Sequence, residues 1–246
     1  MTDKIFSSTD LIMNEDLRNI ELRFTTKRFD LCIFKANNTE FLEKLKETIC
    51  QSLSIDENRL HKYHELNKIE SINSARIDCF NKINRIVDWK LGVAKTISPH
   101  IQYLIGHDLA IQRQMNVSIQ APNDSTSILE PHQDYRSGDS PFQKVIWIPM
   151  TACRESNSLF LENKDEELEP IECDFGDIVI FDPNTIHGNI LNNTDSTRLS
   201  VNFRIKNWFT PDLGEQVPDR QFGIYYEDFI FSRSTLRAFD LLEESI

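Results

Sequence analysis

Three stretches in the first 110 residues repeat hydrophobic side chains every three or four positions, which predicts amphipathic helices. They cover residues 41–53, 69–86 and 89–105. A short apolar strand is expected before them, at Phe29–Phe34. We interpret the hydrophobic stripes as surfaces that pack into a core. The sequence therefore predicts a mainly helical N-terminal part over residues 1–110.

After residue 110 the hydrophobic period changes to two. Residues 111–120 alternate apolar and polar side chains, which predicts a strand with one apolar and one polar face. Several short strands separated by turn residues are typical of a β-sandwich or barrel, so we expect a β core over residues 111–206. Its further strands are expected at Val145–Ile148, Ser158–Leu161, Asp177–Phe181 and Leu199–Ile205.

Residues 207–246 combine the patterns of a loop and of helices. Trp208–Pro218 contains Pro and Gly, which favour a loop, and Glu227–Glu244 has the spacing of one or two helices that would pack on the β core. The chain has no internal repeat and no low-complexity tract. We therefore expect one domain over residues 1–246, mainly β with flanking helices (α+β).

The composition limits the partners of the protein more than its fold. The formal net charge of −12 disfavours non-specific binding to nucleic acid or to an anionic membrane surface. The five Cys are scattered, odd in number and without a CxxC pair, which favours reduced thiols over a disulfide framework. The N-terminus lacks the pattern of a signal peptide, and no stretch approaches the ~20 apolar residues of a membrane helix. A cytoplasmic protein without nucleic-acid or membrane partners is expected, and its oligomeric state is left open.

Two histidines and one aspartate are candidate metal ligands. His132 and Asp134 lie two residues apart, so on a strand their side chains share a face. His187 follows Asp134 by 53 residues (187 − 134), an interval that allows a later strand to return beside the first. Two imidazoles and one carboxylate can bind one face of Fe(II) and leave the opposite face open. An HxD pair alone is also common in exposed loops, and a lone His is more often a hydrogen-bonded residue, so the interpretation depends on the whole set.

An arginine and a hydroxyl follow the last of these candidates. Arg198 comes 11 residues after His187 (198 − 187) and shares a strand face with Ser200. A guanidinium offers the planar, two-pronged donor that a carboxylate matches. A surface salt bridge is the alternative for a lone Arg, but its position after His187 favours a dicarboxylate anchor.

Taken together, these residues resemble a known family, the Fe(II)/2-oxoglutarate oxygenases of the phytanoyl-CoA hydroxylase-like group. Within that group the chain is most similar to bacterial oxygenases of sporadic carbohydrate-biosynthesis gene clusters, through residues 111–114, 137–142 and 147–149. One departure is Asn157-Ser158, where many relatives have Asn-Gly; it puts the geometry of that turn in question. The matching positions are His132/Asp134, Trp147, the polar turn 155–158, Gly176-Asp177, His187-Gly188 and Arg198.

The resemblance implies a double-stranded β-helix (a jelly-roll, cupin-like barrel) with flanking helices. It also implies that Fe(II) is held by His132, Asp134 and His187, that 2-oxoglutarate and O₂ are co-substrates, and that Arg198 with Ser200 anchors the distal carboxylate of 2-oxoglutarate. A core aromatic, a turn Asn and solvent-facing polar residues are the alternatives for the remaining candidate contacts to 2-oxoglutarate, which are Trp147, Asn189, Gln114 and Asn116.

The implied activity is that of an oxidoreductase, a dioxygenase that hydroxylates a small polar biosynthetic intermediate such as a sugar or nucleotide sugar. Succinate and CO₂ would be released from 2-oxoglutarate. Because Asp134 is present, hydroxylation is expected rather than halogenation, while desaturation and ring closure stay open. Tyr135 and Arg136 lie in the loop after the first two ligands and are candidate substrate contacts, with an exposed polar loop as the alternative. A cupin-type metal-dependent sugar isomerase or epimerase and a non-catalytic jelly-roll binding domain remain open as other functions.

Overall fold

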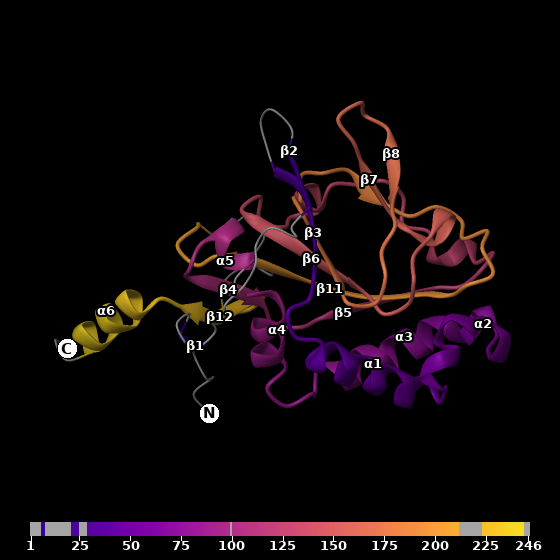
Figure 1. Ribbon diagram of the computed structural model, residues 1–246, viewed down its shortest axis with the longest axis horizontal. Helices are drawn as coiled ribbons and strands as arrows, with labels where there is room; N and C mark the ends of the chain where they lie inside the picture. Colours follow the sequence, from indigo (N-terminus) through magenta and orange to yellow (C-terminus); the bar gives the residue numbers. More distant parts are fainter. Residues whose placement is uncertain (1–5, 8–20, 25–28, 99, 212–222, 244–246) are drawn as a thin grey trace.

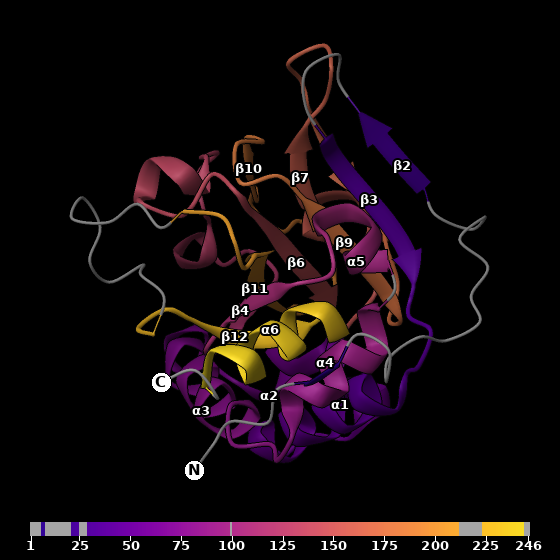
Figure 2. The same ribbon diagram turned by 90° about the vertical axis from the view of Figure 1, so that its left-hand side faces the viewer.

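Helices α1 to α4 of the N-terminal part lie together on one side of the large sheet (Figures 1 and 2). The computed structural model describes residues 6–7, 21–24, 29–98, 100–211 and 223–243. Figures 1 and 2 show α1 to α4 beneath the strands of a large sheet. The predicted helical stripes at 41–53 and 69–86 are confirmed, because they fall on α1 and α3. The helices are α1 (Glu40–Leu53), α2 (Tyr63–Leu66), α3 (Ile72–Ile83), α4 (Trp89–Ile97) and α5 (His100–Ile105), with short 3₁₀ helices at Glu57–Lys62 and Ile69–Ser71.

The expected helix over residues 89–105 is divided into α4 and α5. Ser98 leaves the helical region, with φ −79° and ψ 142°, and ends α4. The sequence places Pro99 directly after it, and a residue before proline is disfavoured in the α conformation. The hydrophobic pattern was therefore right about helical character, but the proline interrupts it.

The large sheet contains nine strands, and all its pairings except β1 with β12 are antiparallel. Along the sheet the order is β1-β12-β4-β11-β6-β9-β3-β2, and β5 pairs with β11 beside β4. The strands predicted at Phe29–Phe34, Val145–Ile148, Asp177–Phe181 and Leu199–Ile205 are all present in this sheet. The bounds are β1 (Phe6–Ser7), β2 (Glu21–Phe24), β3 (Phe29–Lys35), β4 (Leu109–Gln112), β5 (Asn116–Gln120), β6 (Gln143–Pro149), β9 (Asp177–Phe181), β11 (Arg198–Asn207) and β12 (Tyr226–Phe231).

The single strand expected over residues 111–120 is wrong, because the structure has two strands there. β4 pairs with β11 up to Ile205, and β5 resumes pairing with β11 at Asn202. Between them the backbone of Met115 is bonded by the side chain of Asn84 instead of by β11 (2.7 and 2.9 Å). The side chain of Met115 is fully buried, so the break serves to insert it into the core.

A smaller sheet of three strands faces the large one, in the order β10-β7-β8. It contains β7 (Leu159–Glu162), β8 (Leu168–Ile171) and β10 (His187–Gly188), all antiparallel. The sequence pattern predicted β7 but missed β8, which contains Pro170 and lies at the edge of the sheet. Edge strands tolerate proline because one side of the strand needs no ladder hydrogen bonds.

The two faces of the large sheet have different surroundings. One face packs against α1, α3 and α4 through residues such as Ile146, Ile180 and Phe203 in one hydrophobic cluster. The other face belongs to a second cluster, with Trp147, Val179 and Phe181, which also includes Leu159 and Leu161 of the small sheet. Because successive side chains on a strand alternate between faces, β3, β6 and β9 each contribute to both clusters. The candidate site lies on the second face, between the sheets.

The C-terminal part differs from the expected loop and helices. Only residues 208–211 of the expected Trp208–Pro218 loop are described. Within the stretch expected to be helical, residues 226–231 form β12, because this run is buried and pairs with β4 and β1. Residues 233–243 form α6, which stands off the sheets in Figure 1 rather than lying on them. Phe239 connects it to Trp208, with ring centroids 5.7 Å apart.

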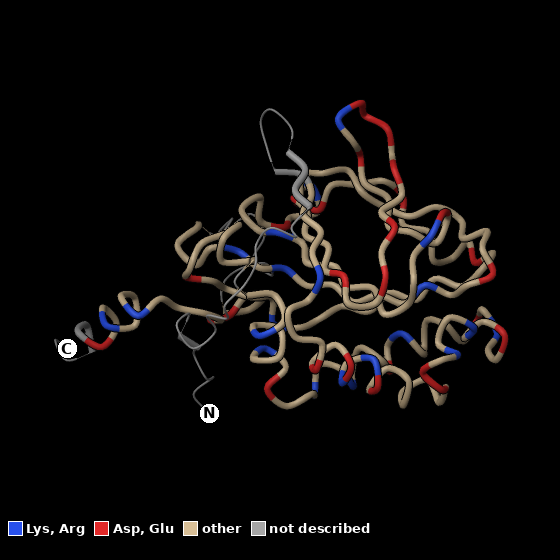
Figure 3. Tube along the Cα trace, in the orientation of Figure 1, with Lys and Arg blue, Asp and Glu red and all other residues tan. Residues whose placement is uncertain are grey.

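Charged residues of both signs alternate along α1 and α3, as is usual for solvent-facing surfaces, whereas acidic residues predominate on the β7–β8 hairpin (Figure 3). Among the described residues, none of the helices combines the length and the apolar character that crossing a membrane would require.

Candidate metal and co-substrate site

His132 and His187 are placed opposite each other by backbone pairing. They form an isolated antiparallel bridge, in which each N–H donates to the carbonyl of the other residue (2.9 Å both ways). Their rings lie with centroids 4.4 Å apart. The two histidines that are 55 positions apart in sequence (187 − 132) are therefore held as direct neighbours.

Asp134 completes the cluster from the first turn of a 3₁₀ helix, Asp134–Ser137, rather than from the strand that the spacing suggested. Its Oδ1 lies 3.3 Å from His132 Nε2 and 3.4 Å from His187 Nε2. One ligand atom from each residue falls within 4.8 Å of the others. Neighbouring ligands of one transition-metal ion lie roughly 3 Å apart, given bonds of about 2.1 Å. The donor set and its spacing therefore fit an ion bound by two imidazoles and one carboxylate.

Backbone carbonyls fix which ring nitrogen each histidine presents. His132 Nδ1 lies 2.9 Å from the Glu130 carbonyl, and His187 Nδ1 lies 2.9 Å from the Thr185 carbonyl. Because a carbonyl only accepts, Nδ1 carries the hydrogen in both rings, and the lone pair of a neutral ring is on Nε2. Both Nε2 atoms face Asp134, so the second contacts of the histidines orient them as ligands.

The charge state of Asp134 also suits a ligand. Burial opposes its ionisation, but the hydrogen bonds that His132 and His187 donate from Nε2 when their rings are protonated, together with the charge of Arg204, outweigh burial and hold the pKa of Asp134 far below its usual range. The carboxyl group is therefore an anion at any physiological pH.

The turn that delivers His187 is held by its own hydrogen bonds. Asp182 follows β9 and accepts from the backbone N–H of Asn184 (2.8 Å), while Lys144 of β6 forms a 2.6 Å ion pair with it. The ring of Phe181 meets His187 edge-on, with centroids 4.7 Å apart. The Asp-Pro turn after β9 thus places His187 on β10, opposite His132.

Arg198 and Ser200 lie on the face of β11 that points between the sheets. Arg198 is 4 % exposed, and its Nη1 donates to the Ser158 carbonyl at 2.9 Å. Its Nε and the Oγ of Ser200 are buried without a hydrogen-bond partner. Burial lowers the pKa of Arg198, and no described residue forms an ion pair with it. A buried cation and a buried hydroxyl that both lack partners fit an anionic ligand bound beside them.

The other residues predicted from the sequence fall into three environments. Trp147 is buried in the cluster between the sheets, on the strand next to β11. Asn189 is buried, but its amide is occupied, because it bonds the backbone of Ser127 and Leu129. Asn116 lines a large cavity, whereas Gln114 is exposed in the break between β4 and β5. Tyr135 and Arg136 are exposed, with the guanidinium 6.0 Å from the Tyr ring centre.

The cavity that Asn116 lines has a volume of about 1000 Å³ and lies beside α3, β5 and β11. Its wall combines apolar side chains, such as Ile72, Phe80 and Leu129, with amides, hydroxyls and guanidinium groups, which suits a molecule that has both polar groups and apolar surface. Arg204 lines this cavity and also donates from Nη2 to Asp134 Oδ2 at 2.8 Å, so it connects the cavity to the ligand cluster. The polar residues of the wall include Asn73, Arg76, Asn116, Ser118, Asn202 and Arg204.

Arg204 is the site residue that the sequence interpretation missed. The same rule that paired Arg198 with Ser200 extends to Asn202 and Arg204, since all four alternate along β11. A signal was therefore present in the sequence.

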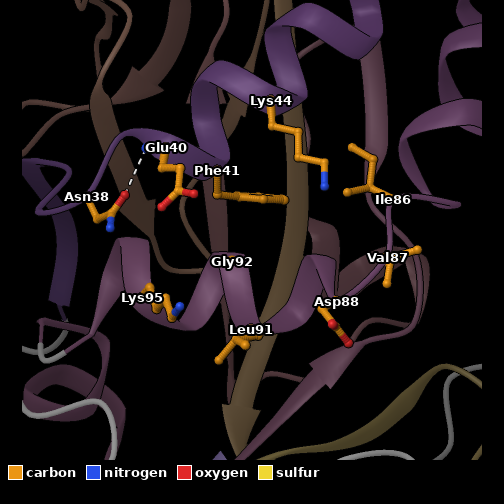
Figure 4. Close-up of a pocket in the computed structure, with 10 residues that line it drawn as sticks. All are labelled: Asn38, Glu40, Phe41, Lys44, Ile86, Val87, Asp88, Leu91, Gly92 and Lys95. Atoms are coloured by element: carbon orange, nitrogen blue, oxygen red, sulfur yellow. Dashed lines mark hydrogen bonds between the residues drawn. The ribbon is translucent and has the colours of Figure 1, made fainter.

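A smaller pocket, of about 150 Å³, lies between α1 and α4 (Figure 4). Phe41, Lys44, Leu91 and Lys95 line it, and none of the predicted site residues does. We assign it no part in the site.

Gly188→Ala should weaken the ligand cluster. A Cβ at residue 188 would lie 2.6 Å from the Leu129 carbonyl oxygen and 3.1 Å from the Pro131 nitrogen, which are backbone atoms of the segment leading to His132. We expect the free energy of unfolding to fall by about 1–3 kcal/mol. We also expect Co(II) affinity to fall, because His187 and His132 are pushed apart; thermal unfolding and Co(II) titration measure both effects.

Gly176→Ala is the matched control for this substitution. Gly176 has φ +95° but no atom within 4 Å of an added Cβ. The free energy of unfolding of the Gly176→Ala protein should fall by about 1–2 kcal/mol, because alanine is strained in the left-handed backbone region. Its Co(II) affinity should stay unchanged. A Gly188→Ala protein with the Co(II) affinity of the unmodified protein would contradict the close packing of the two segments as a requirement of the site.

The chain is similar to known proteins in sequence over a short stretch and in structure over most of its length. No family model matches the sequence. The streptomycin biosynthesis protein StrG of Streptomyces griseus is 30 % identical over 95 residues, which are 38 % of this chain and 45 % of StrG, so the match spans less than half of that relative. The non-heme monooxygenase ThoJ in its apo form is similar in structure, with a TM-score of 0.53 and 15 % identity over 92 % of both chains. Its nickel complex gives a TM-score of 0.52 and 17 % identity over 80 % of this chain and 78 % of that one. The protein therefore shares its fold with ThoJ, a non-heme monooxygenase.

Proposed function

We propose that the protein is an Fe(II)- and 2-oxoglutarate-dependent oxygenase that hydroxylates a small polar molecule. The observation that carries this proposal is the combination of the His132/Asp134/His187 cluster with Arg198, a fully buried cation that no described residue neutralises. Three protein ligands leave positions for a chelating 2-oxo acid and for O₂. The distal carboxylate of 2-oxoglutarate would neutralise Arg198.

We further propose that the two sheets form a double-stranded β-helix. Successive segments alternate between the sheets: β5, β6, β9 and β11 belong to the large sheet, and the His132 bridge, β7–β8 and β10 to the small one. Residues 111–206 would then be the jelly-roll core of a single domain and would contain every proposed ligand. The fold that the chain shares with ThoJ supports this arrangement.

In this mechanism the protein binds and orients the reactants. His132, Asp134 and His187 would hold the iron, while Arg198 donates from its guanidinium and Ser200 from its hydroxyl to the 2-oxoglutarate carboxylate. When bound, iron and 2-oxoglutarate would supply the oxidation, in which O₂ would be consumed and 2-oxoglutarate converted to succinate and CO₂. Trp147 and the apolar cluster around it keep water away from this region. Asp134 occupies the position that a halide would need, so hydroxylation is favoured over halogenation.

The large cavity beside α3, β5 and β11 is the proposed place of the substrate. Its amides and hydroxyls can exchange hydrogen bonds with a polyhydroxylated molecule such as a sugar. StrG is named for streptomycin biosynthesis, which supports a small-molecule biosynthetic substrate. Asn189 is better assigned to holding the 127–129 segment at the cavity wall than to 2-oxoglutarate, because both of its amide atoms are bonded to that segment.

The test is 2-oxoglutarate turnover by the Fe(II)-loaded protein under air. We expect slow succinate release without any substrate, dependent on both Fe(II) and 2-oxoglutarate, and faster release when a panel of sugars and nucleotide sugars includes a true substrate. Folded, metal-loaded protein that neither binds nor consumes 2-oxoglutarate would contradict the proposal. A sugar isomerised or epimerised by such protein would then identify the cupin-type alternative.

A further inference from the structure

Asp134 has two carboxylate oxygens with different partners. Oδ1 faces the two histidines at 3.3 and 3.4 Å, while Oδ2 accepts a hydrogen bond from Arg204 Nη2 at 2.8 Å. The carboxylate can therefore offer Oδ1 to a metal while Oδ2 remains bonded to the guanidinium. Charge-assisted bonds of this kind are strong and directional when they are shielded from water.

Arg204 is itself held on several sides. Its side chain is 13 % exposed, Nη1 donates to Asn202 Oδ1, and Nε lies 3.8 Å from Asp139 Oδ2. Asp139 thus adds a second negative charge beside the guanidinium. Nε has no hydrogen-bond partner among the described residues, so two hydrogen bonds, to Asn202 and to Asp134, hold the guanidinium. A planar guanidinium anchored on Asn202 resists a rotation of the Asp134 carboxylate that would break the bond to Oδ2.

Arg204 is separate from the proposed 2-oxoglutarate anchor. It lies six positions after Arg198 on the same strand (204 − 198), which corresponds to roughly 20 Å of backbone. Arg198 has no acidic partner among the described residues, whereas Arg204 is paired with a proposed metal ligand. The two arginines on one face of β11 therefore have different roles.

The opposite side of Arg204 belongs to the cavity wall. Asn202 and Asn116 line the same cavity, and Asn116 Nδ2 donates to Asn202 Oδ1 at 3.3 Å. A hydrogen-bonded path thus runs from the cavity through Asn202 and Arg204 to Asp134.

We propose that Arg204 is a positioning residue that holds Asp134 as a one-oxygen ligand, and that it does so from the wall of the substrate cavity. The inference rests on the proposed metal site. Partners that orient a metal ligand in this way contribute roughly 10- to 100-fold to metal affinity. A substrate that hydrogen-bonds Asn116 or Asn202 would act on the ligand through the same path.

Two substitutions separate the position of the guanidinium from its charge. Arg204→Lys keeps the positive charge but loses the planar fork, so we expect Co(II) affinity to fall roughly 10-fold or more. Arg204→Gln removes the charge as well and frees Oδ2. The visible spectrum of bound Co(II) should then change, because a carboxylate that binds with both oxygens raises the coordination number. Loss of stability alone would not alter this spectrum.

Arg154→Gln is the matched control, since Arg154 forms a 2.6 Å ion pair with Asp174 outside the ligand cluster. It should keep the Co(II) affinity and spectrum of the unmodified protein, and circular dichroism checks that each variant is folded. Folded Arg204 variants with unchanged Co(II) affinity and spectrum would overturn the positioning role, as would full rescue by Arg204→Lys, which would leave a role for charge alone. Failure of the unmodified protein to bind Co(II) would instead overturn the metal site itself.

Discussion

Arg198→Met should weaken 2-oxoglutarate binding roughly 30-fold or more while leaving the metal in place. The proposed charge pair between Arg198 and the co-substrate is buried, and removing one partner of such a pair costs about 2–5 kcal/mol, or roughly 30-fold and more in affinity. The free energy of unfolding of the ligand-free protein, in contrast, should not fall. Arg198 is a desolvated cation without an acidic partner among the described residues, so its replacement by an apolar side chain should leave the free energy of unfolding unchanged or raise it.

Both effects can be measured on the same samples. Thermal unfolding with and without 2-oxoglutarate gives the ligand-free stability and the stabilisation by the co-substrate, and Co(II) titration reports the metal site. Arg198→Lys keeps the charge without the fork and should retain part of the binding. An Arg198→Met protein that turns over 2-oxoglutarate with an unchanged half-saturating concentration would show that the anchor is elsewhere.

His132→Ala should eliminate metal-dependent turnover. The variant retains one imidazole and one carboxylate, and loss of one of three ligands should lower metal affinity by roughly 100-fold or more. His132 is only partly buried, so the fold should tolerate the change. Succinate release should fall to the level of metal-free protein, and Co(II) titration should show the lost affinity.

His61→Ala is the control, because it makes the same His-to-Ala substitution outside the ligand cluster. The side chain of His61 is exposed, and its backbone carbonyl, which accepts from the Thr197 N–H at 2.7 Å, is unaffected by the substitution. This variant should turn over 2-oxoglutarate like the unmodified protein. Unchanged turnover in His132→Ala would remove His132 from the ligand set.

The sequence predicted the members of the ligand cluster better than the way they meet. Residues two apart on a strand share a face, and this rule proposed His132 with Asp134. The structure brings them together differently, because Asp134 starts a 3₁₀ helix and His132 meets His187 across a two-residue bridge. A bridge this short depends on tertiary packing and leaves no periodic pattern in the sequence.

Arg204 and β12 show two further features that a local sequence pattern cannot predict. The alternation along β11 includes Arg204, but nothing in the sequence says that Asp134 will be its partner, since 70 residues separate them (204 − 134). The apolar residues of β12 have a spacing that also fits a helix. Pairing with β4 decides in favour of a strand, and this long-range partner cannot be read from the segment itself. In contrast, α1 was predictable because its apolar stripe has the helical period over its whole length.

The two faces of β11 have different surroundings. The number of residues in this strand is therefore as constrained as their identity. Leu199, Val201 and Phe203 point into the core beneath the sheet, and Arg198 and Arg204 point toward the site. Inserting or deleting one residue within the strand would exchange the two faces beyond that point. Apolar side chains would enter the site, and guanidinium groups would face the helices. Evolution of this strand can therefore proceed by substitution, but hardly by a change in the number of its residues.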